Sequence, residues 1–371
     1  MIKKHKLITR IQEEKILGRK PYKMVSTEAK QLYKDQTILV TGAAGSIGSY
    51  ICREIIKLQI DTLIMYDHNE SGLYDLYQNL LLQDNRDNKV IMVGDICNEN
   101  SLELLFQSHK PDIVFHAAAY KHVPIMEQQP FEAVRTNILG TKLVASLSVK
   151  HDVKKFIFVS TDKAVNPSSI LGATKRISEL YLILQTNQKS SDCQFISCRF
   201  GNVLESNGSV VPLLKKQIKH GRSVTITHPE VTRFFMTISE ATSFLLESAF
   251  IGNQGEILFF DMGEPIKILD IAKFLITSSN ATDDVDIIYT GLRPGEKIHE
   301  EEILEQANSS STSHPKIFKI LTNYTILNLF QTNFALLEKH FQDHNELDMV
   351  KTMKLLLPEF KSKVSRFEAL D

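Results

Sequence analysis

An acid and a base stand side by side directly after an apolar run of the sequence. Asp162 and Lys163 follow the segment 156–160, FIFVS, and a second lysine, Lys175, lies further along the chain. A neighbouring carboxyl group and amine can donate and accept protons in one reaction. To act as a base, Lys163 must lose its own proton, so we expect burial or a nearby cation to lower its pKa. A solvated surface ion pair is the alternative interpretation of the two residues.

Three glycines indicate a phosphate-binding turn. Gly42, Gly45 and Gly48 follow the apolar run 37–41 and stand where a helix is expected to begin. Glycine permits the tight turn and lets backbone N–H groups approach a pyrophosphate closely. The combination of strand, glycines and helix predicts a dinucleotide site, whereas the glycines alone would be weak evidence.

Asp67 bears on the choice of cofactor because it ends the second apolar run. A carboxylate at that position favours the ribose hydroxyl of NAD, although His68 and Lys89 could offset its charge and leave NADP possible. Asp95 follows the third run and could bind the adenine amino group or cap the next helix. His116 ends the fourth run and is interpreted as a hydrogen-bonded core histidine.

Short apolar runs alternate with amphipathic stretches from residue 37 onward. Such runs, rich in β-branched residues, are typical of strands buried on both faces of a parallel sheet. With helices between them, they predict an α/β fold with a doubly wound parallel sheet. The runs are 37–41, 62–66, 90–93, 112–116, 156–160 and 195–200, and the expected helices include 47–58, 70–82 and 131–150.

The alternation loosens after residue 202, which indicates a second, smaller lobe of mixed α/β structure. Ser239 is expected to cap a helix there, and ANSSSTSHP (307–315) is expected to be a flexible loop. The predicted division is an N-terminal arm (1–35), a dinucleotide-binding Rossmann domain (36–202, with 233–263 packing back on it), the smaller lobe (203–232 and 264–306), and a flexible loop with C-terminal helices (307–371).

Composition excludes several classes of function. The 371 residues carry a formal net charge of −1, so the chain has no electrostatic signature of a nucleic-acid partner. The 4 cysteines form no Cys-x-x-Cys pair and favour a reducing compartment. No metal-ligand spacing, signal peptide or membrane-spanning run is present, so we expect a cytoplasmic protein with no metal and no membrane partner.

Several motifs occur together in one order and carry a family resemblance. They are the Gly-x-x-Gly-x-x-Gly turn, HAAAYKHVPIMEQQP, VSTDKAVNP…GATKR, RFGNVLESNGSVVP, TRFFMTISEA and LRPGEK. Together they resemble the extended short-chain dehydrogenase/reductases, specifically the UDP-N-acetylglucosamine 4,6-dehydratases that begin bacillosamine-type and polysaccharide precursor synthesis. Many relatives carry membrane helices ahead of this domain, and this chain is expected to be a membrane-free form.

The resemblance implies a reaction and roles for the acid and the base. Such a dehydratase oxidises C4 of the sugar, eliminates water across C5 and C6, and returns the hydride to C6, with a tightly bound, recycled cofactor. Asp162 is then the acid toward the C6 oxygen, Lys163 the base at C5, and Thr161 a hydrogen-bonding partner near the C4 oxygen. Lys175 corresponds to the lysine of the dehydrogenase Tyr-x-x-x-Lys motif. Leu171 replaces the tyrosine, so the acceptor of the C4 hydroxyl proton is Asp162, Lys163 or a water.

The resemblance also implies two sets of binding residues. The expected cofactor contacts are Gly42, Gly45, Ser46, Ile47, Gly48, Asp67, Asp95, Ile96, Ala117, Ala118, Ala119, Lys121, Asn137 and Lys175. The expected contacts with a UDP-sugar substrate are His122, Asn202, Val210, Thr225, Arg233, Arg293 and Glu296.

Other functions on the same scaffold are a C5-inverting dehydratase, a 4-epimerase and a catalytically silent nucleotide-sugar-binding protein. The missing tyrosine argues against an epimerase, and the intact Thr-Asp-Lys sequence argues against a silent binder. The family commonly pairs through helices of the dinucleotide domain, so a homo-oligomer is expected through 131–150 and 171–185.

Overall fold

A nine-stranded sheet forms the centre of the computed structural model, which describes residues 10–22, 25–186, 192–279, 285–301, 309–321 and 329–371. Its order is β14-β15-β11-β6-β5-β4-β1-β2-β3, and every pair from β11 to β3 is parallel. The doubly wound parallel sheet is therefore confirmed. The strands are β1 (Thr37–Thr41), β2 (Thr62–Asp67), β3 (Lys89–Val93), β4 (Ile113–His116), β5 (Lys155–Val159), β6 (Gln194–Arg199), β11 (Ile257–Phe260), β14 (Ser309–Ser311) and β15 (Ile317–Ile320).

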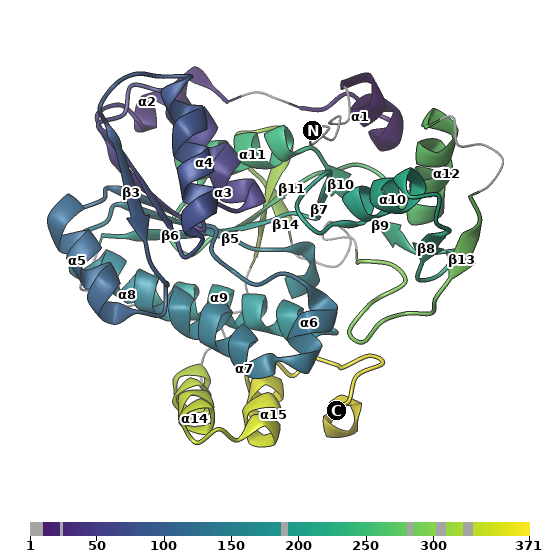
Figure 1. The fold of residues 1–371 in the computed structure, drawn as a ribbon. Helices are drawn as coiled ribbons and strands as arrows, with labels where there is room; N and C mark the ends of the chain where they lie inside the picture. The colour runs from purple at the N-terminus through teal and green to yellow at the C-terminus, as the bar shows by residue number, and fades with distance from the viewer. Residues whose placement is uncertain (1–9, 23–24, 187–191, 280–284, 302–308, 322–328) are drawn as a thin grey trace.

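Helices cover both faces of the sheet, with α3, α4 and α11 above it and α5, α8 and α9 below it in Figure 1. This is the arrangement that right-handed crossovers between parallel strands produce. The upper helices, with α2 beside α11, are α2 (Thr27–Leu32), α3 (Ser46–Ile55), α4 (Glu70–Leu81) and α11 (Ile238–Ile251). The lower ones are α5 (Glu99–His109), α6 (Val123–Gln128), α7 (Pro130–Ala133), the π-helix η1 (Val134–Gly140), α8 (Thr141–Lys150) and α9 (Ile170–Thr186).

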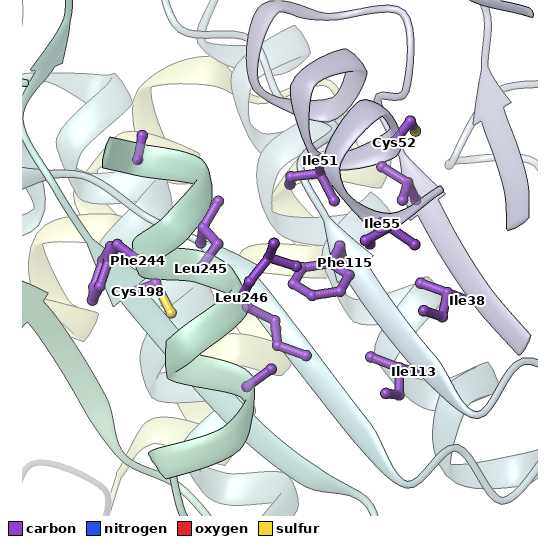
Figure 2. Packing of buried hydrophobic residues seen from close by; sticks show 14 of the residues in the cluster. Ile38, Ile51, Cys52, Ile55, Ile113, Phe115, Cys198, Phe244, Leu245 and Leu246 are labelled. Atoms are coloured by element: carbon purple, nitrogen blue, oxygen red, sulfur yellow. The ribbon is translucent and has the colours of Figure 1, made fainter. Parts of the chain in front are cut away.

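The apolar strands pack against these helices to form the core. Figure 2 shows side chains of α3 and α11 turned toward Phe115 of β4, which is fully buried. Cys52, Cys193 and Cys198 are buried and form no disulfide. No helix in the described ranges is long and apolar enough to cross a membrane.

A smaller lobe stands beside the sheet, on the right in Figure 1, with a hydrophobic cluster of its own. Its elements are α10 (Val210–Lys219), α12 (Ile268–Ser278), β8 (Val224–Ile226) paired in parallel with β13 (Ile287–Tyr289), and β9 (Thr232–Arg233) paired antiparallel with β12 (Ile266–Lys267). The short parallel pair β7 (Asn202–Val203) and β10 (Phe235–Met236) lies where the chain leaves the sheet. Ile16 and Leu17 of α1 (Arg10–Leu17) belong to the cluster of this lobe.

Two helix caps differ from the predicted residues. α11 begins after Thr237, not Ser239, and Thr237 forms a capping box with Glu240. The side chain of Asn98, not Asp95, accepts the N–H of Ser101 at the start of α5. In both cases the capping side chain accepts the N–H of the residue three positions later. The sequence pattern alone does not tell which of several neighbouring polar residues makes the cap.

Residues 309–311 of the serine-rich segment form a strand and not the expected loop, whereas 312–315 lie in the turn before β15. Ser309–Ser311 forms β14 and pairs antiparallel with β15, a strand that the sequence analysis did not predict. β15 in turn pairs antiparallel with β11. A strand at the edge of a sheet that carries only polar side chains shows no alternation of hydrophobic residues in the sequence. Its structure depends instead on backbone hydrogen bonds to the neighbouring strand, which the sequence does not reveal. Residues 307–308 lie outside the described residues.

The two predicted C-terminal helices are α14 (Phe330–Gln342) and α15 (Glu346–Leu356), and 322–328 lies outside the described residues. They pack below α8 and α9 in Figure 1. The ring of Phe334 stacks on Tyr181 at 5.1 Å between centroids, and Lys142 pairs with Glu338. Helices α14 and α15 therefore cover part of the surface of α8 and α9 through which subunits were expected to pair. A subunit interface on that part would have to displace α14 and α15.

Truncation of Leu337 tests whether α14 belongs to the main core. Leu337 is fully buried between α14 and the lower helices, whereas its neighbour Leu336 is 36% exposed. We expect Leu337→Ala to lower the free energy of unfolding by about 2–5 kcal/mol, because it leaves a cavity. Leu336→Ala is expected to cost less than about 1 kcal/mol. Urea denaturation monitored by circular dichroism measures both, and equal losses would contradict the packing.

Candidate active site

The acid and the base lie on a turn directly beyond the carboxyl end of β5. Asp162 and Lys163 form a short 3-10 helix with Ala164, and the side chain of Thr161 accepts the N–H of Lys163 at its start. The N–H of Asp162 donates to the carbonyl of Phe200 at 3.1 Å, which ties the turn to the chain leaving β6. The carboxyl ends of parallel strands form the usual ligand crevice of such a sheet, so the turn occupies the expected place for chemistry.

Lys163 is held between two carboxylates. Its Nζ lies 2.9 Å from Asp162 Oδ1 and 3.4 Å from Glu300 Oε1, and it donates to Asn202 Oδ1 at 3.2 Å. Burial lowers the pKa of Lys163, but the negative charges of Asp162 and Glu300 outweigh burial and the pKa is raised overall. The expectation of a lowered pKa is therefore wrong for this structure, because the sequence did not reveal the second carboxylate.

One oxygen of Asp162 has no hydrogen-bond partner. The side chain is 1% exposed, and Oδ1 accepts from both Thr161 and Lys163. Oδ2 is buried and unpartnered among the described residues. A buried carboxylate oxygen without a partner is costly unless a ligand or a proton satisfies it. Asp162 can therefore present a proton or an acceptor to a bound molecule.

Lys175, unlike Lys163, has a lowered pKa. Its Nζ donates to the carbonyl of Val159 at 2.8 Å and lies 4.4 Å from the ring centre of Phe158. Burial lowers its pKa to about 7, although the charge of Glu179 opposes the shift. Leu171 lies one turn earlier on α9, is 4% exposed and packs in the hydrophobic cluster under the C-terminal helices. An alkyl side chain cannot take a proton, so this position contributes packing only.

His116 is a core histidine, as predicted. It is fully buried between Thr41 Oγ1, 2.7 Å from Nδ1, and Thr141 Oγ1, 2.9 Å from Nε2. Burial, with a smaller contribution from the charge of Lys175, lowers the pKa of His116 to about 3. It is thus neutral and hydrogen-bonded at any physiological pH.

A buried ion-pair network supports the turn from below. Glu179 of α9 is fully buried and accepts from Ser160, which directly precedes Thr161, at 2.6 Å. Arg199 donates to the same carboxylate through Nε at 2.7 Å and through Nη2 at 2.5 Å. Burial raises the pKa of Glu179, but Arg199 and its hydrogen bonds lower it overall, so the carboxylate stays charged.

The glycine turn has the geometry that a phosphate-binding turn needs. Gly42 has φ +67°, and a Cβ on Gly48 would lie 2.1 Å from the carbonyl oxygen of Gly42. Gly45 is the N-cap of α3, and no side chain caps the helix at that end. Free N–H groups at the start of a helix bind anionic groups, so Ser46, Ile47 and Gly48 can hold a pyrophosphate.

Asp67 is fixed at the end of β2. Its carboxylate accepts the N–H of Ala44 at 3.0 Å and the N–H of Asn69 at 2.9 Å. His68 lies 4.0 Å away with a side chain that is 72% exposed, and Lys89 donates instead to the carbonyl of Arg86. The carboxylate thus stands beside the glycine turn, as a ribose-binding group would.

Other predicted cofactor residues make contacts within the protein. Asp95 pairs with Arg135 at 2.5 Å, and Ile96 packs where a Cβ on Gly140 would meet it. Asn137 is fully buried and bonds the backbone of Tyr120 and the hydroxyl of Thr174, which joins the segment after β4 to α9. That segment holds Ala117, Ala118 and Ala119, and a Cβ on Gly42 would lie 2.6 Å from the N of Ala118. Lys121 Nζ reaches Ser206 Oγ at 3.4 Å, and burial lowers its pKa.

The predicted substrate residues fall into two groups. Asn202 and Arg233 meet at the catalytic turn, where Asn202 contacts Lys163 and Arg233 lies 3.5 Å from Glu300. The remaining residues lie on separate segments outside this cluster. Val210 begins α10, Thr225 on β8 bonds Gln217, His122 abuts Gly208, and Arg293 forms an ion pair with Glu296 at 2.6 Å. No cluster of three or more metal-binding side chains occurs within the described ranges.

Sequence reasoning missed Glu300 and the C-terminal tail. Glu300 stands in the run HEEE, and nothing in that run separates it from its acidic neighbours. The tail pairs its backbone with the catalytic loop, because Lys361 donates to the carbonyl of Pro167 and Lys363 to that of Ser168. No local sequence signal indicates contacts between such distant segments.

Comparison with known proteins places the chain in a family. A sequence model of the family described as "Polysaccharide biosynthesis protein" matches residues 38–322. The chain belongs to this family. The capsular polysaccharide biosynthesis protein CapD of Staphylococcus aureus is 44% identical over 84% of this chain and 52% of its own length. A UDP-glucose 4-epimerase of Rickettsia rickettsii is 32% identical over 88% of this chain and 96% of its own. The chain spans about half the length of CapD.

Solved structures share the architecture of this family member. Pen from Bacillus thuringiensis is 33% identical with a TM-score of 0.73, over 78% of this chain and 90% of that one. The dTDP-glucose 4,6-dehydratase DesIV from Streptomyces venezuelae has a TM-score of 0.63 at 20% identity, over 71% and 87% of the two chains. At that identity the likeness shows the fold alone.

The lowered pKa of Lys175 predicts a pH-dependent stability. Between pH 7 and its usual value of 10.5 the unfolded chain binds a proton that the folded chain does not. The free energy of unfolding therefore rises with pH in this window, by up to about 1.4 kcal/mol per pH unit. Urea denaturation at pH 7 and pH 9 is expected to give a flatter dependence for Lys175→Met. The exposed control Lys154→Met is expected to keep the wild-type slope, and equal slopes for all three proteins would contradict the assignment.

Proposed function

We propose that the protein is a nucleotide-sugar 4,6-dehydratase that converts UDP-N-acetylglucosamine to UDP-2-acetamido-2,6-dideoxy-4-hexulose. The observation that carries the proposal is the Asp162–Lys163 ion pair at the end of β5, in which the buried carboxylate has one unpartnered oxygen. An elimination needs an acid and a base close together, and a simple alcohol dehydrogenase or a binding module does not. The membership in a polysaccharide biosynthesis family supports a sugar substrate.

The acid and the base arise from the resting ion pair by one internal step. Transfer of a proton from Lys163 Nζ to Asp162 Oδ1, 2.9 Å apart, gives a neutral amine and a neutral acid without changing the total charge. The amine then takes the proton from C5, and the C5–H electron pair forms the C5–C6 double bond. Asp162 gives its proton to the departing C6 hydroxyl, which leaves as water. The protein ends this step with the same ion pair with which it began.

The cofactor in this proposal is of the NAD type and is retained through the cycle. When bound, it would accept the hydride from C4 and return it to C6, and Lys163 would return a proton to C5. The free N–H groups at the start of α3 would hold its pyrophosphate, and Asp67 would accept hydrogen bonds from the adenosine ribose. Lys175, buried beside the end of β5, would hydrogen-bond the nicotinamide ribose. The proton of the C4 hydroxyl passes to Asp162, Lys163 or a water, because Leu171 cannot accept it.

A 4-epimerase is the second candidate, and relatives named UDP-glucose 4-epimerase favour it. The buried Leu171 argues against it, because an epimerase on this scaffold uses a tyrosine at that position as its base. A dehydratase that also inverts C5 would use the same acid and base. A silent binding protein would have no use for the unpartnered Asp162 oxygen.

Incubation of the purified protein with UDP-N-acetylglucosamine separates these functions. NMR is expected to show a 4-keto-6-deoxy sugar with the original configuration at C5. We expect Asp162→Asn and Lys163→Met each to reduce kcat by about 10²–10⁴-fold, because each removes one partner of the elimination. Glu54→Gln and Lys57→Met disrupt an exposed ion pair on the surface and are the controls. A 4-epimer, an inverted C5 or unchanged substrate would each replace the proposal with the corresponding alternative.

The identity of the bound cofactor is a separate test. Protein purified without added nucleotide is denatured, and the released dinucleotide is identified by chromatography and mass spectrometry. We expect NAD, because the carboxylate of Asp67 repels a 2′-phosphate. Asp67→Ala is expected to release less NAD per chain, and recovery of NADP from the wild type would contradict the assignment.

A further inference from the structure

A carboxylate from a distant segment stands against the catalytic lysine. The side chain of Glu300 is 4% exposed, and its Oε1 lies 3.4 Å from Lys163 Nζ. The same oxygen lies 3.5 Å from Nε of Arg233 on β9. Glu300 thus connects the turn after β5 to the strand that carries Arg233, in a place where a charged group is almost completely removed from water.

Arg233 holds this carboxylate from the opposite side. Its guanidinium is fixed by the carbonyls of Thr232, Ile298 and Lys297, at 2.7, 3.0 and 2.9 Å. Because these three carbonyls hold the guanidinium in place, Arg233 has a fixed position beside Glu300. Three charged groups therefore act on Lys163: Asp162 and Glu300 are negative, and Arg233 is positive.

We propose that Glu300 is a positioning residue that directs the Lys163 amine over the catalytic turn and keeps it protonated in the resting enzyme. The proposal rests on the proposed function for the role of Lys163 as the base. A flexible lysine side chain loses much conformational freedom when it is held in one orientation, and two carboxylates and an amide oxygen share that task here. Because Glu300 is itself fixed by Arg233, it can hold the amine in a defined direction.

The charge of Glu300 also makes a pH effect measurable. Asp162 and Glu300 both stabilise the ammonium form of Lys163, whereas Arg233 opposes it. Replacement of Glu300 by the neutral, similarly shaped glutamine removes one of the two stabilising charges. The pKa of Lys163 then falls, so the transfer of its proton to Asp162 costs less and its neutral amine persists to lower pH. Arg233 keeps its three carbonyl acceptors in the variant, which favours correct folding.

Chemical labelling of Lys163 tests the proposal without turnover. The purified full-length protein is treated with trace acetic anhydride across a pH series, and the acetylation of Lys163 is quantified by mass spectrometry. In Glu300→Gln we expect the labelling rate at a fixed pH below the midpoint to rise about tenfold. In the same variant the acidic limb of the kcat/KM profile is expected to move to lower pH by a similar amount.

Two further variants keep the test decisive. Glu301→Gln is the matched control, because Glu301 is the next residue and pairs with Lys297 instead. It is expected to label as the wild type does. Glu300→Asp keeps the charge but withdraws the carboxylate by one methylene, so we expect wild-type labelling and a kcat reduced at least about threefold. This variant carries the test if Glu300→Gln does not fold.

The outcomes separate this proposal from the function on which it rests. Faster labelling of Lys163 in Glu300→Gln supports it even if UDP-N-acetylglucosamine is not converted, because labelling needs no substrate. Labelling of Glu300→Gln at the wild-type rate would overturn it, as would an unchanged kcat in Glu300→Asp with an active wild type. A change of the same size in Glu301→Gln would also overturn it, because the effect would then belong to the segment and not to Glu300.

Discussion

The pairing of buried charges at the carboxyl end of β5 is the constraint on which the site depends. Asp162, Lys163, Arg233 and Glu300 come from three separate segments and meet where little water reaches them. A charge in such a place is stable only with partners of the opposite sign and with hydrogen bonds to its remaining polar atoms. The four groups sum to zero charge. Among the described residues, the atom of these groups that is buried without a hydrogen-bond partner is Oδ2 of Asp162, where a ligand can satisfy it.

Hydrogen bonds from the surrounding elements hold the turn with these charges in place. Glu179 and Arg199 form a second buried pair beneath the turn and fix Ser160, the residue before Thr161. From the far side, the backbone of the C-terminal tail bonds the carbonyls of Pro167 and Ser168. Ser365 donates to Glu127 at 2.6 Å, and Glu127 also accepts the N–H at the start of α9. The catalytic turn is therefore held from below by the sheet and from outside by the end of the chain.

The two lysines of the site have opposite electrostatic environments. Lys163 keeps its proton because two carboxylates outweigh its burial, whereas Lys175 has only Glu179 to offset burial and titrates near pH 7. This contrast is consistent with the different tasks proposed for them, a proton exchanged with Asp162 in one case and a hydrogen bond to the cofactor in the other. The same principle separates His116, neutral between two threonines, from the reacting groups.

The sequence by itself determined the parts of the protein that depend on neighbouring residues in the chain. Apolar runs predicted the parallel strands, the glycines predicted the turn after β1, and Asp162-Lys163 predicted a reactive turn after β5. Tertiary structure alone decided that Lys163 keeps its proton and that Glu300, of the acidic residues in HEEE, contacts it. It also decided that Ser309–Ser311 pairs as a strand and that α14 and α15 pack over α9. These features depend on distances between segments far apart in the chain, and electrostatic and packing energies follow those distances and not the spacing of residues along the sequence.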